Sequence, residues 1–178
     1  MNEYAGERIS TTHQHQLYFW TATINGWQHL LANDSMKLEI IQSLQWLKVR
    51  QLISVYAFVI MPNHMHLIWQ LNGLNGKESA KGSLLKFTAH RFRKILMDTN
   101  PILLETYQSS ASNKTHEFWQ PDSQAFPLYQ RTTINQKINY IHNNPVSGKW
   151  QLAATADAYR FSSANYYHHE VAAKLKLG

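Results

Sequence analysis

The feature that most constrains this sequence is a pair of apolar runs joined by a turn. The runs Ile53–Ile60 and His64–Leu71 flank a short segment containing Pro62-Asn63, which predicts two antiparallel strands of one hairpin. Successive side chains of a strand point to opposite faces, so the second run has one apolar face that needs a core to pack against. That face consists of Met65, Leu67, Trp69 and Leu71.

The opposite face of the second run carries two histidines, His64 and His66. Because they stand two residues apart, both imidazoles point from the same face and converge just above the sheet. This geometry suits one divalent cation or one reacting phosphate. Taken alone, an H-x-H pattern also fits two ordinary polar residues on a solvated strand face.

The remaining elements are predicted from residue spacing and from helix and turn signals. We expect strands at Leu17–Ile24, His116–Trp119 and Phe126–Tyr129, and helices at Ser35–Arg50, from an N-cap at Ser83 to about Met97, and at Thr133–Asn143. This order predicts an α+β fold, a ferredoxin-like antiparallel sheet with helices packed on one face and the active site between the sheet and the C-terminal helix. The whole chain, 1–178, is expected to form one domain, with flexible ends at 1–14 and 168–178.

The composition favours a polyanionic partner. Seventeen lysines and arginines against eleven acidic residues give a net charge of +6, and the chain is rich in histidine, tryptophan and tyrosine. Cations mixed with aromatic rings are typical of proteins that bind single-stranded nucleic acid. The absence of cysteine excludes disulfides and thiolate metal sites. No apolar run reaches about 18 residues, and 1–16 lacks a signal-peptide segment, so we expect no membrane partner and a cytoplasmic, nucleoid-associated protein.

The C-terminal helix carries a tyrosine beside its apolar stripe. Ile134, Ile138 and Ile141 form that stripe. Tyr140 lies on a different face of the helix from the stripe, so its hydroxyl is free to act. Asn144 precedes a proline and is therefore predicted at the helix end. Two imidazoles and one amide oxygen can hold Mg²⁺ or Mn²⁺ beside a phosphate that the tyrosine attacks. The alternative for Tyr140 alone is a ring packed at the core margin.

Several separated motifs resemble those of the single-tyrosine HUH transposases, most of all the REP-associated branch. Met61–Ile68 resembles the H-U-H motif and Tyr140–Val146 the tyrosine motif, while Phe118–Gln120 and Tyr159–Ala164 match the REP-associated branch. The resemblance extends from about Tyr18 to Tyr167. It differs from the compact insertion-sequence members at Asn144, where they have glutamine; asparagine fits the REP-associated branch, whose genes are often single-copy housekeeping genes.

The resemblance implies a metal-dependent DNA strand transferase. Such an enzyme nicks and joins single-stranded, hairpin-containing DNA through a covalent 5′-phosphotyrosine, as in DNA transposition. Residue by residue, it implies Tyr140 as the nucleophile, His64 and His66 as metal ligands and Asn144 as a third ligand. The metal would be Mg²⁺ or Mn²⁺. A homodimer is possible and a monomer is not excluded, which leaves open whether Tyr140 acts with its own histidines or with a partner's.

A basic surface is predicted on the helix after Ser83. Lys86, His90, Arg93 and Lys94 share one face and Arg91 lies on its flank, which suits a phosphate backbone but also fits a solvated helix face. Lys137, one turn before Tyr140, can steady the scissile phosphate or face water. Trp20 and Trp27 are expected in the core rather than as base-stacking platforms.

Two alternative functions follow from the same residues. One is a non-catalytic, domesticated protein that binds hairpin DNA. The other is a nucleotide hydrolase of the histidine-triad kind, which needs H-x-H-x-H; the third position here is Ile68, so this alternative fails at its nucleophile.

Overall fold

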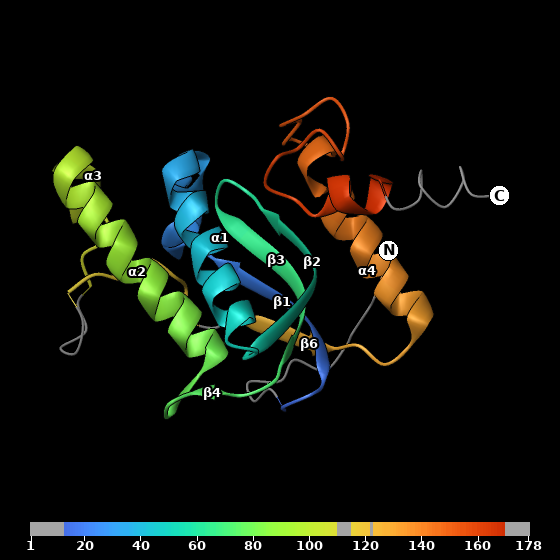
Figure 1. Cartoon of the computed structure of the whole chain (residues 1–178). Helices are drawn as coiled ribbons and strands as arrows, with labels where there is room; N and C mark the ends of the chain where they lie inside the picture. The colour runs from blue at the N-terminus through green and yellow to red at the C-terminus, as the bar shows by residue number, and fades with distance from the viewer. Residues whose placement is uncertain (1–12, 110–114, 122, 170–178) are drawn as a thin grey trace.

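The computed structural model describes residues 13–109, 115–121 and 123–169. Figure 1 shows a sheet with helices on both sides, and the strands form an antiparallel sheet in the order β2-β3-β1-β6. The strands of this sheet are β1 (Leu17–Thr23), β2 (Ile53–Ile60), β3 (His64–Leu71) and β6 (Gln124–Pro127). The helices are α1 (Asp34–Val49), α2 (Ala80–Thr99), α3 (Pro101–Glu105) and α4 (Arg131–Asn143), and short 3₁₀ helices span Asn25–Trp27, Leu30–Ala32 and Asn144–Val146.

The α+β fold class with an antiparallel sheet is confirmed. The helices were expected on one face, but they lie on both, because α4 packs on β2 and β3 from the side opposite α1 and α2. The two strands of the predicted hairpin have the predicted bounds, and Ile60 pairs with Met65 next to the turn. Within the described ranges no helix has the length and apolar character needed to cross a membrane. The ends predicted to be flexible, 1–14 and 168–178, lie almost wholly outside the described residues.

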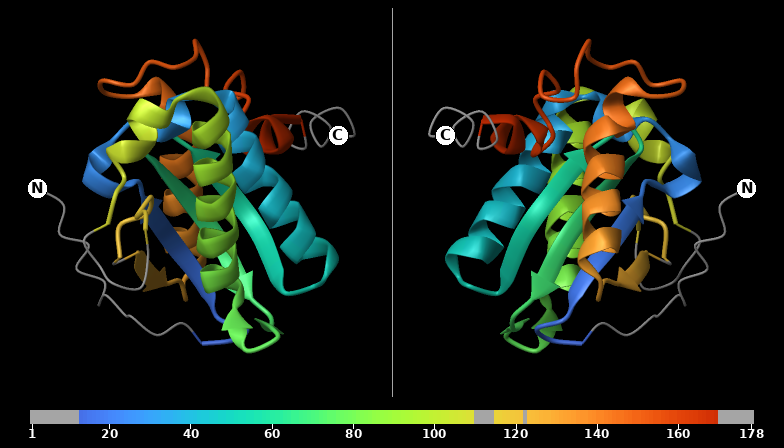
Figure 2. Two further views of the ribbon diagram at one scale, coloured as in Figure 1. Left: turned by 90° about the vertical axis from the view of Figure 1, so that its left-hand side faces the viewer. Right: turned by 90° about the vertical axis from the view of Figure 1, so that its right-hand side faces the viewer.

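The sheet has an apolar face and a face that carries the histidines. On the apolar face Trp20 stacks on Trp69, with 4.6 Å between ring centroids, and both rings are fully buried together with Met65 and Leu67. Helices α1 and α2 lie side by side over this face, whereas α4 lies on the other side of the sheet (Figure 2). The core therefore occupies the face that the alternation of β3 predicts, and α4 covers the face that carries the histidines.

Helix α2 begins earlier than predicted. The segment before it contains a small hairpin of β4 (Leu74–Asn75) and β5 (Glu78–Ser79), and Ser79 rather than Ser83 caps the helix by accepting from the Gly82 N–H at 3.0 Å. Ser83 lies inside the helix and donates to Glu78 at 3.0 Å. The predicted cap was wrong because two serines satisfied the same signal, and only the hairpin determines which one starts the helix.

The strand predicted at Phe126–Tyr129 is shifted in the structure. β6 spans Gln124–Pro127, and its residues are fixed by pairing with β1, where Phe126 faces Phe19. The piece predicted at His116–Trp119 makes only isolated bridges, from Trp119 to Ile24 and from His116 to Gln108.

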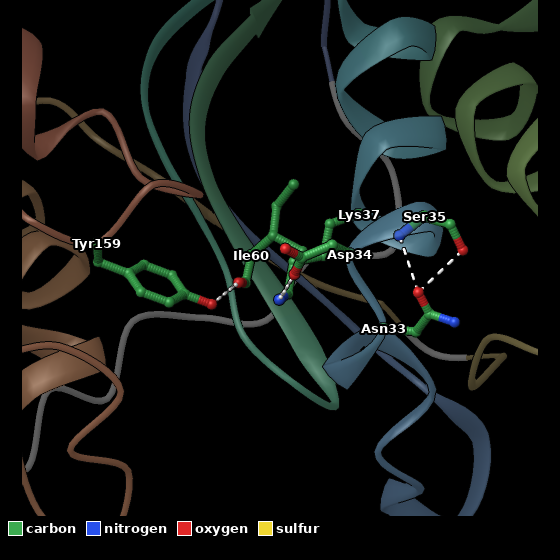
Figure 3. A network of polar contacts seen from close by, with 6 residues as sticks. All are labelled: Asn33, Asp34, Ser35, Lys37, Ile60 and Tyr159. Atoms are coloured by element: carbon green, nitrogen blue, oxygen red, sulfur yellow. Dashed lines mark hydrogen bonds and ion pairs between the residues drawn. The ribbon is translucent and has the colours of Figure 1, made fainter.

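The segment after α4 is fastened to the end of β2. The Tyr159 hydroxyl donates to the Ile60 carbonyl at 2.8 Å, just before the hairpin turn (Figure 3). The same view shows the start of α1, where the Ser35 N–H donates to the Asn33 side chain and Lys37 pairs with Asp34 at 2.8 Å. The Tyr159 bond therefore ties the segment after α4 to the hairpin that carries the histidines, whereas the other two contacts stabilise the first turn of α1.

We expect Tyr159→Phe to lower the free energy of unfolding by about 1 kcal/mol, because it leaves a buried carbonyl without its donor. Urea denaturation followed by circular dichroism measures this change. Tyr56→Phe is the matched control: the Tyr56 hydroxyl bonds to Gln70 at 3.3 Å on a ring that is 48% exposed. Equal stability of wild type and Tyr159→Phe would show that the tail is not held by this bond.

Candidate active site

Pairing of three strands brings polar residues together on the face that α4 covers. Thr21 of β1 pairs with His66 of β3 on one side and with Gln124 of β6 on the other, and Thr23 pairs with His64. Residues that are directly paired across strands lie on the same face. The two histidines therefore project with these residues from one face, as the alternation predicts.

The His66 side chain is held at one ring nitrogen and open at the other. Its Nδ1 lies 2.8 Å from the Thr21 hydroxyl, and its ring stacks on Phe19 with 5.2 Å between centroids. Its Nε2 is buried and has no hydrogen-bond partner among the described residues. The Nε1 atoms of Trp20 and Trp69 also lack a partner there, but they lie in the apolar core, whereas His66 lines a cavity open to solvent, where a ligand can satisfy the costly buried atom. With the Nδ1–H donating to Thr21, the lone pair of His66 is on Nε2.

His64 is oriented in the same way by a neighbouring amide. Its Nδ1–H donates to the Asn63 side-chain oxygen at 2.7 Å, which leaves the lone pair on Nε2. The Asn63 side-chain nitrogen donates in turn to the carbonyl of Trp27 at 3.3 Å, so Asn63 links His64 to the loop after β1. The rings of His64 and His66 are 4.7 Å apart between centroids.

Both imidazoles are held in their neutral form. Burial, aided by the charge of Lys149, lowers the pKa of His64 to about 4. Burial also lowers the pKa of His66 well below its usual value, with His64 and Lys137 contributing. A neutral imidazole is the form that coordinates metal ions, and the two lysines give the surroundings a positive potential that suits a phosphate.

Tyr140 of α4 lies directly beside His66. Their ring centroids are 5.4 Å apart, and the tyrosine is 51% exposed. Lys137, one turn earlier, places its Nζ 4.6 Å from the centroid of Phe19 and 5.8 Å from that of Tyr140, and burial lowers the pKa of this lysine. These residues line a cavity of about 270 Å³ that is open to solvent. A tyrosine, a lysine and a histidine therefore share one cavity.

Asn144 lies one turn after Tyr140, at the end of α4, as predicted. Its backbone N–H donates to the Tyr140 carbonyl, and the residue is buried. In the part of the chain that the structure describes, no group of three His, Cys, Asp or Glu residues is arranged to hold a metal. A cation at the histidine pair would therefore need a ligand of another type, for which an amide oxygen such as that of Asn144 is chemically suitable.

The two histidines fit a divalent metal by their own hydrogen bonding. In metal sites, the second ring nitrogen of a ligating histidine is normally bonded to an oxygen, which fixes the ring and its tautomer. Both Nδ1 atoms have such a partner, in Thr21 and Asn63, whereas the Nε2 of His66 has none within the described part of the chain. The donor set carries no carboxylate, so the site would attract a cation weakly until an anionic phosphate joins it.

The basic residues predicted on α2 lie across the sheet from the histidines (Figure 2). Arg91 donates two hydrogen bonds of 2.8 Å to Glu39 and thereby joins α2 to α1, and Lys86 lies 3.8 Å from Glu78. Of the six residues predicted to contact DNA, Lys137 is the one that lines the cavity of Tyr140. The DNA contacts of the other five stay predictions.

Sequence reasoning missed several residues that line or flank this cavity. Trp27, expected in the core, is 59% exposed and lies with its ring 6.5 Å from that of His64. Gln120 and Gln124 line the cavity, and Lys149 lies close to His64. The Asn25-Gly26 turn was a signal that Trp27 leaves the strand. Gln120 belongs to the Phe118–Gln120 motif, and its N–H donates to the Thr23 carbonyl at 2.8 Å, whereas Gln124 gave no signal, because its position depends on the pairing of β6 with β1.

Comparison with protein-family models finds no match, and comparison with curated proteins finds none either. Among solved structures, the chain is similar to the REP-associated tyrosine transposase bound to a REP hairpin. The TM-score is 0.61 at 21% sequence identity, and the match covers 97% of this chain and 86% of that chain. At this identity the likeness shows a related fold, over nearly the whole chain.

Proposed function

We propose that this protein is a DNA strand transferase that cleaves and rejoins single-stranded, hairpin-containing DNA through Tyr140. The observation that best supports this function is the unpartnered Nε2 of His66 beside the half-exposed ring of Tyr140. A related fold is found in a transposase bound to a REP hairpin, which supports hairpin DNA as the partner. The net charge of +6 is consistent with a polyanionic substrate.

His64 and His66 would hold the divalent cation, with Asn144 as the third ligand. When bound, Mg²⁺ or Mn²⁺ would polarise a non-bridging phosphate oxygen and offset the negative charge that develops during phosphoryl transfer. Thr21 and Asn63 would keep both imidazoles in the orientation and tautomer that direct the Nε2 lone pairs toward one point.

In the proposed reaction the Tyr140 oxygen attacks the scissile phosphorus as its hydroxyl proton leaves. The new bond joins the tyrosine to the 5′ phosphate, and the bond to the 3′ oxygen breaks, so that a protonated 3′ hydroxyl is released. Rejoining is the reverse, with another 3′ hydroxyl attacking the phosphotyrosine. The Lys137 ammonium group lies near the rings of both Phe19 and Tyr140, where it can hold a non-bridging oxygen of the same phosphate.

We expect Tyr140→Phe to retain hairpin binding and to abolish the covalent adduct, because only the hydroxyl is removed. Denaturing gels of protein incubated with labelled DNA hairpins and Mn²⁺ or EDTA report the adduct. Tyr129→Phe, at an exposed tyrosine just before α4, is the matched control and keeps wild-type adduct levels. A wild-type level of adduct in Tyr140→Phe would refute the assignment, and hairpin binding without any wild-type adduct would favour the non-catalytic DNA-binding protein.

We expect His64→Ala and His66→Ala to remove Mn²⁺ binding, and Asn144→Ala to weaken it partly. Because the site has no carboxylate, wild-type affinity for Mn²⁺ should rise at least about tenfold when single-stranded DNA supplies a phosphate. Isothermal titration with Mn²⁺, with and without DNA bound to Tyr140→Phe protein, measures this. His13→Ala, at an exposed histidine, is the control. Unchanged Mn²⁺ binding in both histidine variants would contradict the metal role.

We expect Lys137→Ala to slow adduct formation by about 10²-fold, in line with the loss of one charge-stabilising donor, while DNA affinity changes little. Single-turnover kinetics at saturating DNA separates the two effects. Lys48→Ala, at an exposed lysine of α1, should match wild type in both. A lower affinity with an unchanged single-turnover rate would make Lys137 a general phosphate contact instead.

A further inference from the structure

We infer that the cavity beside Tyr140 binds one nucleobase of the DNA strand, stacked on Trp27 and read at its edge by Gln124 and Gln120. Since this subsite belongs to the proposed strand transferase, its assignment rests on that function. Through this subsite, protein side chains would give the enzyme a preference for one base at the nucleotide next to the scissile phosphate.

The cavity has the size and lining of a base pocket. At about 270 Å³ it can take one nucleobase, and its walls combine aromatic rings with neutral amides and hydroxyls. Among the described residues no acidic side chain lines it, and Lys137 supplies the positive charge. An aromatic face with neutral hydrogen-bonding groups suits a base, whereas the lysine and the histidines suit the phosphate attached to it.

Trp27 is presented to solvent by a strained turn. Its backbone has a φ of 56°, in the left-handed region that residues other than glycine rarely adopt. The turn is fixed by its N–H, which donates to the Ile24 carbonyl at 2.9 Å, and by its carbonyl, which accepts from Asn63. Strained backbone that exposes a large ring beside reactive groups is typical of binding sites. The same Asn63 orients His64, so Trp27 and His64 are held in a fixed position relative to each other.

Gln124 stands at the right distance from the histidines for the base of a bound nucleotide. It lies in one row with Thr21 and His66, two strands away, which corresponds to about 10 Å. This is close to the span of one nucleotide from its phosphate to the pairing edge of its base. The side-chain amides of Gln120 and Gln124 have no hydrogen-bond partner among the described residues, and each offers one donor and one acceptor edge of the kind that reads bases.

The test measures base preference separately from the covalent reaction. Full-length Tyr140→Phe protein is incubated with labelled DNA hairpins whose flanking single strand is randomised at each position in turn, and bound and free pools are sequenced. In this background we expect one position of the strand to show a base preference. Gln124→Ala should reduce that preference about tenfold, and Trp27→Ala should weaken the overall DNA affinity about tenfold. Trp27→Phe, which keeps a stacking ring, should remain within about threefold of the parent.

Matched controls lie on the opposite side of the sheet. Gln45→Ala and Trp46→Ala remove an exposed amide and an exposed ring from α1 and should leave preference and affinity unchanged. Thermal unfolding of each variant identifies any that fails to fold. An unchanged base preference in Gln124→Ala together with unchanged affinity in Trp27→Ala overturns the base subsite.

Adduct formation with Tyr140 intact distinguishes this failure from failure of the proposed function. Adducts that form equally well in the wild type, Trp27→Ala and Gln124→Ala would keep the transferase and remove the subsite. A base preference that depends on Gln124, without adduct in any wild-type reaction, would keep the subsite in a non-catalytic DNA-binding protein. Absence of any binding to the randomised hairpins would overturn both.

Discussion

The register between β1 and β3 is the constraint on which the rest of the site depends. Antiparallel pairing of Thr21 with His66 and of Thr23 with His64 puts hydroxyls and imidazoles on one face. The same register buries Trp20 and Trp69 on the other face, under α1 and α2. A slip by one residue would exchange the two faces and bury histidines in the core. The large apolar surface that α1 and α2 cover therefore also fixes the direction of both histidines, and a core that holds this register holds the candidate site.

Local alternation predicted much of this arrangement from the sequence. The bounds of β2 and β3, the face of His64 and His66 and the helix that carries Tyr140 all follow from periodicity and from the Pro62-Asn63 turn. The start of α2 did not, because Ser79 and Ser83 are equivalent as local signals and the β4–β5 hairpin decides between them. The position of β6 did not follow either, since a four-residue strand is determined by its partner rather than by its own residues.

The candidate site divides in the same way. His66 and Tyr140 could be predicted from the sequence because each lies in a regular strand or helix, where residue spacing tells on which face a side chain lies. Their closeness across 74 positions of sequence could not be counted; it results from α4 packing on β2 and β3. Trp27 was misassigned because aromatic residues next to a strand are usually core residues, whereas here a left-handed turn rotates the ring out of the core. The position of Gln124 depends on the pairing of β6 with β1, which no local sequence pattern predicted.

The sheet also separates two sources of positive charge. Lys137 and Lys149 lie near the histidines, whereas α2, which carries the other predicted basic residues, lies across the sheet. Part of the α2 charge is used internally, since Arg91 binds Glu39 and Lys86 lies near Glu78. A DNA molecule that contacts both surfaces has to pass around an edge of the sheet. Under the proposed function, the strand that reaches Tyr140 would be the flexible, single-stranded part, because a cavity of about 270 Å³ has room for one nucleobase, and any contact with α2 would involve a more distant segment of the same DNA.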